Sequence, residues 1–292
     1  MMELGLRLAQ ICDKAIGGQE LERSLLESGT AKGRLIHYHS TLDGVIIREN
    51  GKKKGSASKK AHCRKEREHP VRSEQNELED FYLAANRYEV GSHGNGANQW
   101  QQWHYDYGIF TVLTAPMFLR PYCLSETFIA GQLPISCDQE CPYPNGHSCL
   151  QIFDPKKSKV LMVKTSPEKF IIQVGESADI LSKGKLHSTL HRVCKPRNLK
   201  NLSRETFVVF LQPAWSKTFS LSDNAIKSCM LGDEKGTLSE ENNQHDLNGF
   251  AQEVLKTVPR LASRLKDGMT FAEFSRATTK QYYGGSGLQS NR

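Results

Sequence analysis

The stretch LHSTLHRVCKPRNLKNLSRETFVVFLQP, residues 186–213, contains two apolar, β-branched runs, LHSTLHRV and TFVVFLQ, separated by a segment rich in turn residues. Short runs of this composition, bounded by Pro, Asn and Ser, predict β-strands. Similar runs occur upstream at residues 108–114, 149–153, 159–164, 170–174 and 178–181 (GIFTVLT, CLQIF, KVLMVK, FIIQV and ADIL). Many short strands with turns between them favour a mainly β fold, an antiparallel sandwich or barrel, over a parallel α/β sheet.

Helices are predicted on both sides of this β region. Residues 1–30 show leucines at helical spacing, a Gly-Gly break and a second short helix. Residues 216–292 begin as a polar linker and continue into two predicted helices, at 250–265, where a proline interrupts the pattern, and at 269–283. We therefore expect a short helical N-terminal part, a β core at 31–215, and a linker followed by C-terminal helices.

The basic charge of the chain is local. The formal net charge is +7, and the segment from Gly51 to Arg72 alone holds nine Lys/Arg and two Glu. Such a charged segment buries too little apolar surface to offset its ordering entropy, which predicts a mobile surface insertion at about residues 50–98. A nuclear-localisation or polyanion-binding role for this insertion stays open, but we expect no general nucleic-acid-binding surface.

Composition also bears on the compartment. No basic region followed by an apolar run opens the sequence, and no apolar run is long enough to cross a bilayer. The eight cysteines have no repeating spacing, which favours reduced thiols over a disulfide framework. We expect a soluble, monomeric intracellular protein without membrane contact, in the cytoplasm, with a nuclear location as the alternative.

Two segments carry residue types that bind metals. In WHYDYG, residues 103–108, a strand over residues 103–113 would place His104 and Asp106 on the same face. In LHSTLHRV, His187 and His191 would share one face of another strand. Two histidines and one carboxylate form the facial triad of non-haem Fe(II) oxygenases. Taken alone, His104 and Asp106 are also compatible with an ordinary polar start to a strand.

A third segment, SRETFVVFLQP, contains an arginine that could bind an anionic group. Alternation places Arg204 and Thr206 on one face of a very apolar strand. An arginine there needs an anionic or polar partner to offset its desolvation, and a guanidinium fits a carboxylate bidentately. An internal Asp or Glu is the alternative partner to a bound carboxylate.

These pieces together resemble a known family. WHYDYG, LHRV and RET, in this order, resemble the H-x-D, distal H and R-x-[ST] motifs of the 2-oxoglutarate- and Fe(II)-dependent dioxygenases, especially the plant group related to anthocyanidin synthase and gibberellin oxidases. RLIHYHS resembles the family's R-L-N-x-Y-P stretch, with Ile36 and His39 in place of the family's Asn and Pro. The segments CPYPNGHSCLQIF and DGMTFAEFSRATTKQYY are similar to an uncharacterised plant branch of the superfamily.

The resemblance implies a double-stranded β-helix, or jelly roll, with flanking helices. It also implies Fe(II) bound by His104, Asp106 and His191, and 2-oxoglutarate bound by Arg204, Thr206 and Tyr38. Oxidative decarboxylation of 2-oxoglutarate with O2 would then be coupled to hydroxylation or desaturation of a small organic substrate. A non-catalytic jelly-roll binding protein derived from this family is the alternative.

Two alternatives concern the metal ligands. His187 could replace His191, although it lacks the following Arg-Val, so His191 is the preferred ligand. Cys137, Cys141, His147 and Cys149 could bind zinc, but their spacing fits no common zinc finger, which favours a loop with incidental cysteines.

Overall fold

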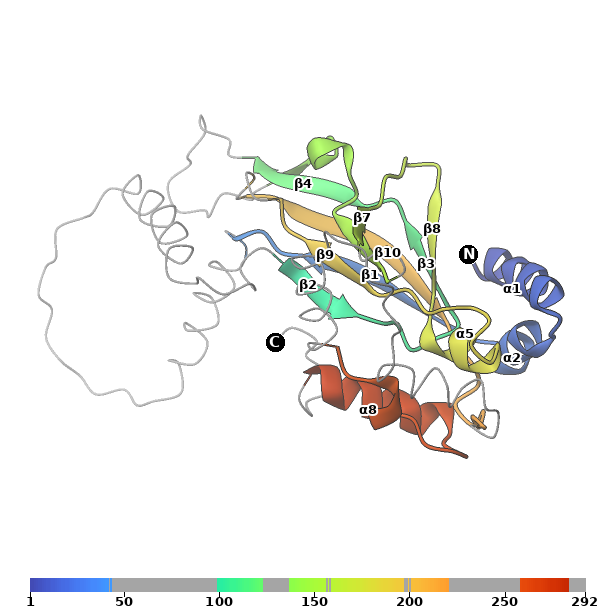
Figure 1. Ribbon diagram of the computed structural model, residues 1–292. Coiled ribbons are helices and arrows are strands. Elements are labelled where there is room, and N and C mark those ends of the chain that lie inside the picture. Colours follow the sequence, from blue (N-terminus) through green and yellow to red (C-terminus); the bar gives the residue numbers. More distant parts are fainter. Residues whose placement is uncertain are drawn as a thin grey trace, which may run out of the picture.

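The computed structural model describes residues 1–41, 43, 99–122, 137–155, 157, 159–196, 199, 201–220 and 258–283. In this part of the chain two antiparallel sheets pack together, with helices at one end and along one side (Figure 1). The predicted mainly β fold is confirmed.

The larger sheet is built around β10, the apolar strand that ends the sequence stretch discussed first. One edge of β10 pairs with β1, and the other pairs with β3 and then with β4, so that β3 and β4 lie along one line. Beyond them, β8 pairs with β3 and β5 with β4. The strands of this sheet are β1 (Ala31–Tyr38), β3 (Phe110–Thr114), β4 (Met117–Tyr122), β5 (Cys137–Cys141), β8 (Phe170–Val174) and β10 (Ser203–Leu211).

The smaller sheet has the order β2-β9-β6-β7. Its strands are β2 (Gln99–His104), β6 (Leu150–Asp154), β7 (Lys159–Met162) and β9 (His191–Cys194). The chain crosses between the two sheets repeatedly. It passes from β1 in the larger sheet to β2 in the smaller one, returns for β3 to β5, and crosses again for β6 and β7. The last three strands alternate, with β8 in the larger sheet, β9 in the smaller and β10 in the larger. This crossing between two sheets is the connectivity of a jelly roll.

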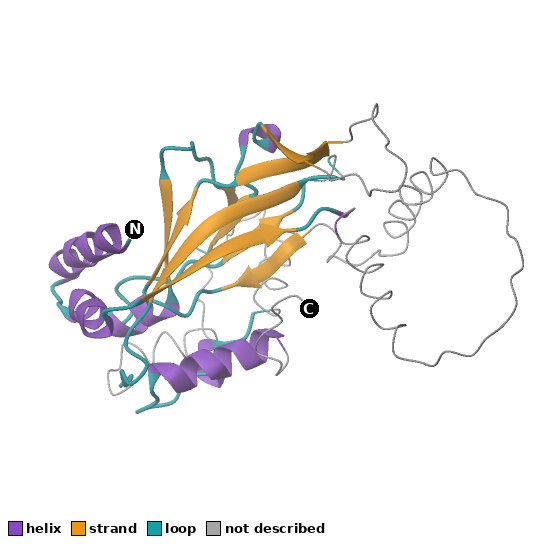
Figure 2. Cartoon of the chain, turned by 180° about the vertical axis from the view of Figure 1, so that it is seen from behind, coloured by secondary structure: helices purple, strands orange, loops and turns teal. Residues whose placement is uncertain are grey.

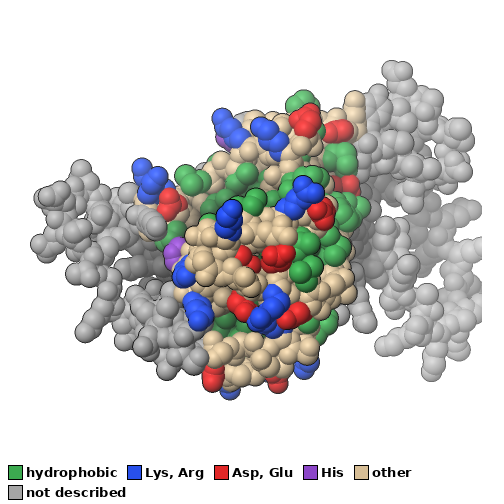
Figure 3. Space-filling view, turned by 90° about the vertical axis from the view of Figure 1, so that its right-hand side faces the viewer, with side chains coloured by type: hydrophobic (Ala, Val, Ile, Leu, Met, Phe, Trp, Pro, Cys, Tyr) green, Lys and Arg blue, Asp and Glu red, His purple; other side chains and the backbone are tan. Residues whose placement is uncertain are grey.

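The N-terminal helices cover one end of the larger sheet (Figures 1 and 2). Helices α1 (Met2–Ile16) and α2 (Glu20–Ser28) place Ala9 and Leu21 against the outer face of β3 and β10. Figure 3 views this end of the molecule and shows hydrophobic side chains between charged groups of both signs. Ion pairs there include Arg7 with Glu3 and Arg23 with Glu20, so no single sign of charge dominates this face.

Two further helices and two 3-10 turns complete the described helical structure. α5 (Glu176–Leu181) follows β8 directly, and α8 (Phe271–Tyr283) packs below it through Phe271 and Phe274, which share a core with Ile180. Short 3-10 turns occur at Pro144–Gly146 and Leu261–Ser263. Within the described residues, none of the helices combines the length and apolarity that a membrane span requires.

Three strand predictions are corrected. ADIL forms part of α5, because the backbone amides after Gly175 bond to the carbonyls of the 106–109 turn instead of to a neighbouring strand. The strand predicted over 103–113 is interrupted, since β2 ends at His104 and β3 begins at Phe110. The strand predicted over LHSTLHRV begins only at His191.

The C-terminal helix at 269–283 is confirmed as α8. In the predicted helix at 250–265, residues 250–257 lie outside the described residues, and the described remainder contains only a 3-10 turn. Pro259 accounts for this, because proline lacks an amide hydrogen and keeps the residue before it extended. The basic insertion also lies outside the described residues.

Candidate metal centre

His104 and His191 are direct partners across the smaller sheet. His104 is the last residue of β2 and His191 is the first residue of β9, and the two are paired in the ladder with ring centroids 4.1 Å apart. Asp106 joins them from the turn that follows β2, not from a continuing strand. One ligand atom from each of the three residues lies within 4.8 Å of the other two.

The imidazole tautomers direct lone pairs at this centre. Nδ1 of His104 lies 2.8 Å from the carbonyl oxygen of Gln102, and Nδ1 of His191 lies 2.9 Å from that of Thr189. A carbonyl only accepts, so each Nδ1 carries the proton and each Nε2 is left as a potential ligand. Both Nε2 atoms lie 3.9 Å from an oxygen of Asp106.

Both imidazoles are buried, and burial favours the neutral form of His104. His104 and His191 are 8% and 5% exposed. Burial and the neighbouring His191 lower the pKa of His104 to about 4. A neutral imidazole is the form that binds metals, so the ring is ready to act as a ligand at neutral pH.

The turn that carries Asp106 is fixed by its surroundings. Thr111 donates its hydroxyl hydrogen to Oδ2 of Asp106 at 2.6 Å. The amide of Glu176, at the start of α5, donates to the carbonyl of Asp106 at 2.8 Å. A Cβ at Gly175 would collide with the carbonyl oxygen of Gly108, so only glycine allows α5 to approach the turn this closely.

A buried ion pair lies behind α5. Arg264 donates to both carboxylate oxygens of Glu176, at 2.7 and 2.5 Å, and also to the hydroxyl of Thr278 at 2.9 Å. Both charged side chains are almost completely buried. The pair therefore connects α8 and the segment before it to the helix that supports the Asp106 turn.

Arg264→Met is expected to lower the free energy of unfolding by about 3–5 kcal/mol, because it leaves the Glu176 carboxylate buried without its partner. Urea unfolding followed by circular dichroism measures this change. The double variant Arg264→Met/Glu176→Gln should recover part of the loss, while Arg7→Ala, which breaks an exposed pair, should have no measurable effect. A single Arg264 variant as stable as the wild type would contradict this role.

Arg204 lies inside the jelly roll. It is 1% exposed, its Nε donates to the carbonyl of Ser148 at 3.0 Å, and its buried Nη1 has no hydrogen-bond partner in the described part of the chain. Within the described residues it forms no ion pair. Burial lowers its pKa from the ordinary value, but a guanidinium stays protonated at neutral pH. The predicted alternative, an internal Asp or Glu, is thus not found in the described part of the chain.

Tyr38 and Thr206 lie on the same inner face as Arg204. The guanidinium carbon of Arg204 lies 5.4 Å from the centre of the Tyr38 ring, and the two residues are partners in the β1–β10 ladder. Thr206 is buried two residues along β10, but its hydroxyl donates to the carbonyl of Thr114 at 3.0 Å. The structure therefore brings Tyr38 to Arg204, whereas the Thr206 hydroxyl is bonded to the backbone.

Two glutamines extend the site beyond the sequence prediction. Gln101 accepts from the Tyr38 hydroxyl at 2.6 Å and lies 2.9 Å, through its Nε2, from Nε2 of His104. Gln173 is 2% exposed, and among the described residues neither polar atom of its amide has a hydrogen-bond partner. It pairs with Thr111 in the β3–β8 ladder, so both side chains are on the inner face.

The alternative ligands lie elsewhere. His187 is exposed and outside β9, and it is not part of the cluster. In the described chain, Cys141, His147 and Cys149 do not form a group of metal-ligand atoms. Cys149 is buried, and burial raises the pKa of its thiol to about 11, which disfavours the thiolate. The side chain of Cys137 lies outside the described residues.

Comparison with known proteins gives a match to one family model over part of the chain. Residues 141–213 match the 2OG-Fe(II) oxygenase superfamily. This superfamily match includes His191, Arg204 and Thr206 and lies C-terminal to His104 and Asp106. No curated protein matches the sequence.

Similar solved structures include a full-length Neurospora crassa protein in complex with alpha-KG, at 14% identity and a TM-score of 0.41, covering 87% of this chain and 54% of the fungal one. They also include the dioxygenase for auxin oxidation 1 of Arabidopsis thaliana with 2-oxoglutarate, at 14% identity and a TM-score of 0.28, covering 65% of each chain. The chain thus spans about half the length of the Neurospora crassa protein.

Proposed function

We propose that this protein is an Fe(II)- and 2-oxoglutarate-dependent dioxygenase. His104, Asp106 and His191 hold the iron, and Arg204 binds the far carboxylate of 2-oxoglutarate. The observation that carries this proposal is the combination, inside one jelly roll, of a buried two-histidine, one-carboxylate cluster and a buried arginine without an anionic partner among the described residues.

The residues fit both groups. Two imidazoles and a carboxylate form the donor set of non-haem Fe(II) enzymes and leave positions for co-substrate and oxygen. The unpartnered Nη1 of Arg204 offers a hydrogen-bond donor that a carboxylate accepts. The amide of Gln101 now bonds to Nε2 of His104, so metal binding requires this amide to turn away.

When bound, Fe(II), 2-oxoglutarate and O2 supply the oxidising chemistry, which yields succinate and carbon dioxide and hydroxylates or desaturates a substrate carbon. The chain positions these groups. The backbone carbonyls of Gln102 and Thr189 hold the two imidazoles in the ligating tautomer. Tyr38 packs against the guanidinium of Arg204 and limits water access to it. The scheme requires no general base from the protein.

The finer features of this proposal come from the sequence resemblance. We place the chain in a plant-type branch related to anthocyanidin synthase and gibberellin oxidases, with a small organic molecule as substrate. We propose a monomer that acts in the cytoplasm, with a nuclear location as the alternative and without nucleic-acid or membrane partners. Thr206 adds a hydrogen bond to the co-substrate if its hydroxyl leaves the Thr114 carbonyl.

Succinate formation tests the proposed activity. The purified chain, given Fe(II), O2 and 2-oxoglutarate, is expected to form succinate slowly without a primary substrate and faster with one. A protein that binds metal and 2-oxoglutarate but forms no succinate would instead be the non-catalytic jelly-roll binding protein. A protein that binds neither would overturn both functions.

Gln173 provides a prediction about the substrate. Its buried amide has no partner among the residues that the structure describes, and it lies on the inner face beside Thr111, which bonds to Asp106. We therefore expect this amide to bond to a polar group of the primary substrate. Gln173→Leu should raise the KM for that substrate by about 10-fold or more, because a hydrogen bond to a buried group contributes about 1–3 kcal/mol. The KM for 2-oxoglutarate should stay within about twofold. An unchanged substrate KM would contradict this assignment.

A further inference from the structure

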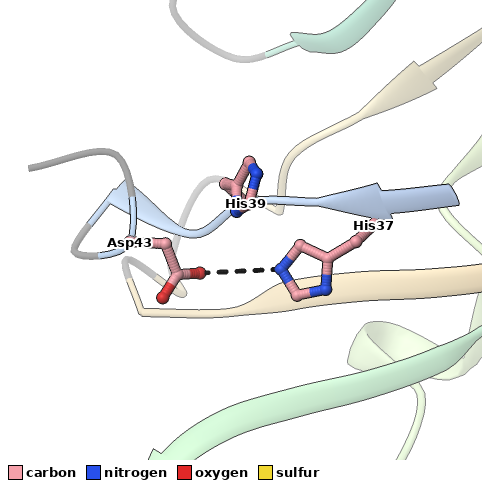
Figure 4. A group of neighbouring side chains, drawn as sticks. All are labelled: His37, His39 and Asp43. Carbon is pink, nitrogen blue, oxygen red and sulfur yellow. Dashed lines mark ion pairs between the residues drawn. The ribbon is translucent and has the colours of Figure 1, made fainter. Parts of the chain in front are cut away.

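A second group of metal-binding residues lies at the end of β1, on the outer side of the larger sheet. His37, His39 and Asp43 each offer one ligand atom, and these atoms all lie within 4.8 Å of one another. Figure 4 shows His37 and Asp43 facing each other, with the His39 ring beside them. Tyr38, between the two histidines in sequence, has the opposite direction in the strand and contacts Arg204 inside the jelly roll.

The distances between the possible ligand atoms are close to those between the ligands of a bound metal ion. Nε2 of His37 lies 3.9 Å from Oδ2 of Asp43, and the rings of His37 and His39 are 4.6 Å apart at 54°. Ligand atoms about 2.1 Å from a tetrahedral zinc ion are separated by about 3.4 Å, so small side-chain rotations suffice. The side chains of His37 and Asp43 are 28% and 29% exposed, which reduces solvent screening and leaves a path for an ion.

Neighbouring groups orient two of these side chains. Nδ1 of His37 lies 2.7 Å from Oε1 of Glu205, its partner across the β1–β10 ladder. Because the carboxylate accepts, Nδ1 carries the proton and Nε2 faces Asp43. Asp43 is held by two hydrogen bonds with Ser40, from the Ser40 amide to Oδ2 at 2.8 Å and from the Asp43 amide to the Ser40 hydroxyl at 3.1 Å.

We propose that His37, His39 and Asp43 form a binding site for a divalent transition metal of the zinc type, separate from the centre inside the jelly roll. The hydrogen bond from His37 to Glu205 is the carboxylate–histidine–metal arrangement that fixes a ligating imidazole. Two imidazoles favour zinc and similar ions over Mg²⁺ and Ca²⁺, which prefer oxygen ligands. Three protein ligands leave a fourth position for water.

The site joins two strands and the segment that follows β1. His37 lies on β1, Glu205 on β10, and His39 and Asp43 in the segment after β1. A bound ion would therefore fix the end of β1 next to Tyr38 without contacting the inner face. The competing arrangement is metal-free, with a protonated His37 between the carboxylates of Glu205 and Asp43.

Zinc binding to the chain of 292 residues tests the site. The double variant His104→Ala/Asp106→Ala removes two ligands of the inner centre and serves as the background. After treatment with a chelator, this background is expected to bind one Zn²⁺ per chain at micromolar free zinc. Zinc should also raise its Tm by roughly 5 °C, as expected when the ligand concentration is far above the Kd.

Further variants in this background locate the ion. His37→Ala, His39→Ala and Asp43→Asn should each weaken zinc binding by about 100-fold or more and remove the Tm shift, while Glu205→Gln, which acts on an orienting residue, should weaken it by about 10-fold. The matched control is His187→Ala, which replaces an exposed histidine outside the cluster and should bind zinc like the background. Circular dichroism identifies any variant that fails to fold.

Three results would overturn the site: a folded background that binds no zinc at micromolar concentration, a His37→Ala variant that binds zinc as tightly as the background, or a His187→Ala control that loses zinc to the same extent as His37→Ala. The first of these is also the result that the metal-free arrangement of His37 between two carboxylates predicts.

Discussion

Asp106→Ala is expected to abolish Fe(II) binding and succinate formation. Among the described residues, Asp106 is the one carboxylate in the inner cluster, and its oxygens lie 3.9 Å from Nε2 of both histidines. Removing it leaves two imidazoles, neither of which carries a negative charge that could balance a divalent cation. Loss of an outer-sphere partner typically weakens metal binding by about 10- to 100-fold, so loss of this ligand should exceed about 100-fold.

Metal analysis and a succinate assay on the folded variant measure both effects. Asp106→Asn keeps the shape and the acceptor for Thr111 but removes the charge, so it should also bind iron weakly. Asp267→Ala, at an exposed position outside the cluster, should behave like the wild type. Wild-type iron content in Asp106→Ala would show that the metal is held elsewhere.

Arg204→Met is expected to raise the KM for 2-oxoglutarate by roughly 100-fold while iron binding stays unchanged. Truncating one partner of a buried, hydrogen-bonded charge pair typically lowers the binding free energy by about 2–5 kcal/mol. A loss of about 1.4 kcal/mol corresponds to a tenfold weaker affinity. Because the described chain gives Arg204 no ion-pair partner, the variant should keep or raise the Tm of the protein in the absence of 2-oxoglutarate.

Two further variants separate charge from geometry. Arg204→Lys keeps the positive charge but loses the planar fork, so it should recover only part of the affinity. Arg276→Met replaces an exposed arginine on α8 and serves as the matched control. An unchanged KM for 2-oxoglutarate in Arg204→Met would remove Arg204 from the co-substrate site.

The apolar runs predict most of the strands, because the tendency of a short segment to form a strand depends on its own β-branched and aromatic residues. TFVVFLQ and FIIQV, for example, combine β-branched and aromatic residues and form β10 and β8. ADIL is too short for its composition to distinguish strand from helix, and its helix depends on contacts with the 106–109 turn. The same turn places Asp106 beside the two histidines. Strand alternation does not predict this position, because Asp106 lies between β2 and β3 and not within a strand.

Sequence motifs identify residues with distinctive chemistry. They do not identify residues whose role depends on which side chain lies opposite them in the sheet. The motifs point to His104, Asp106, His191, Arg204 and Tyr38. The structure places these side chains inside the jelly roll, and their roles stay predictions. Gln101 and Gln173 have no motif, since their importance comes from the side chains opposite them. The outer cluster likewise depends on the pairing of His37 with Glu205, 168 residues away.

The most direct test of the central claim is the position of the metal in a crystal of the protein grown with Mn²⁺ and 2-oxoglutarate. Anomalous scattering is expected to place one ion at bonding distance from Nε2 of His104, Nε2 of His191 and a carboxylate oxygen of Asp106, with a carboxylate of 2-oxoglutarate on Arg204. An ion absent from this cluster, or His191 turned away from it in the loaded protein, would contradict the account.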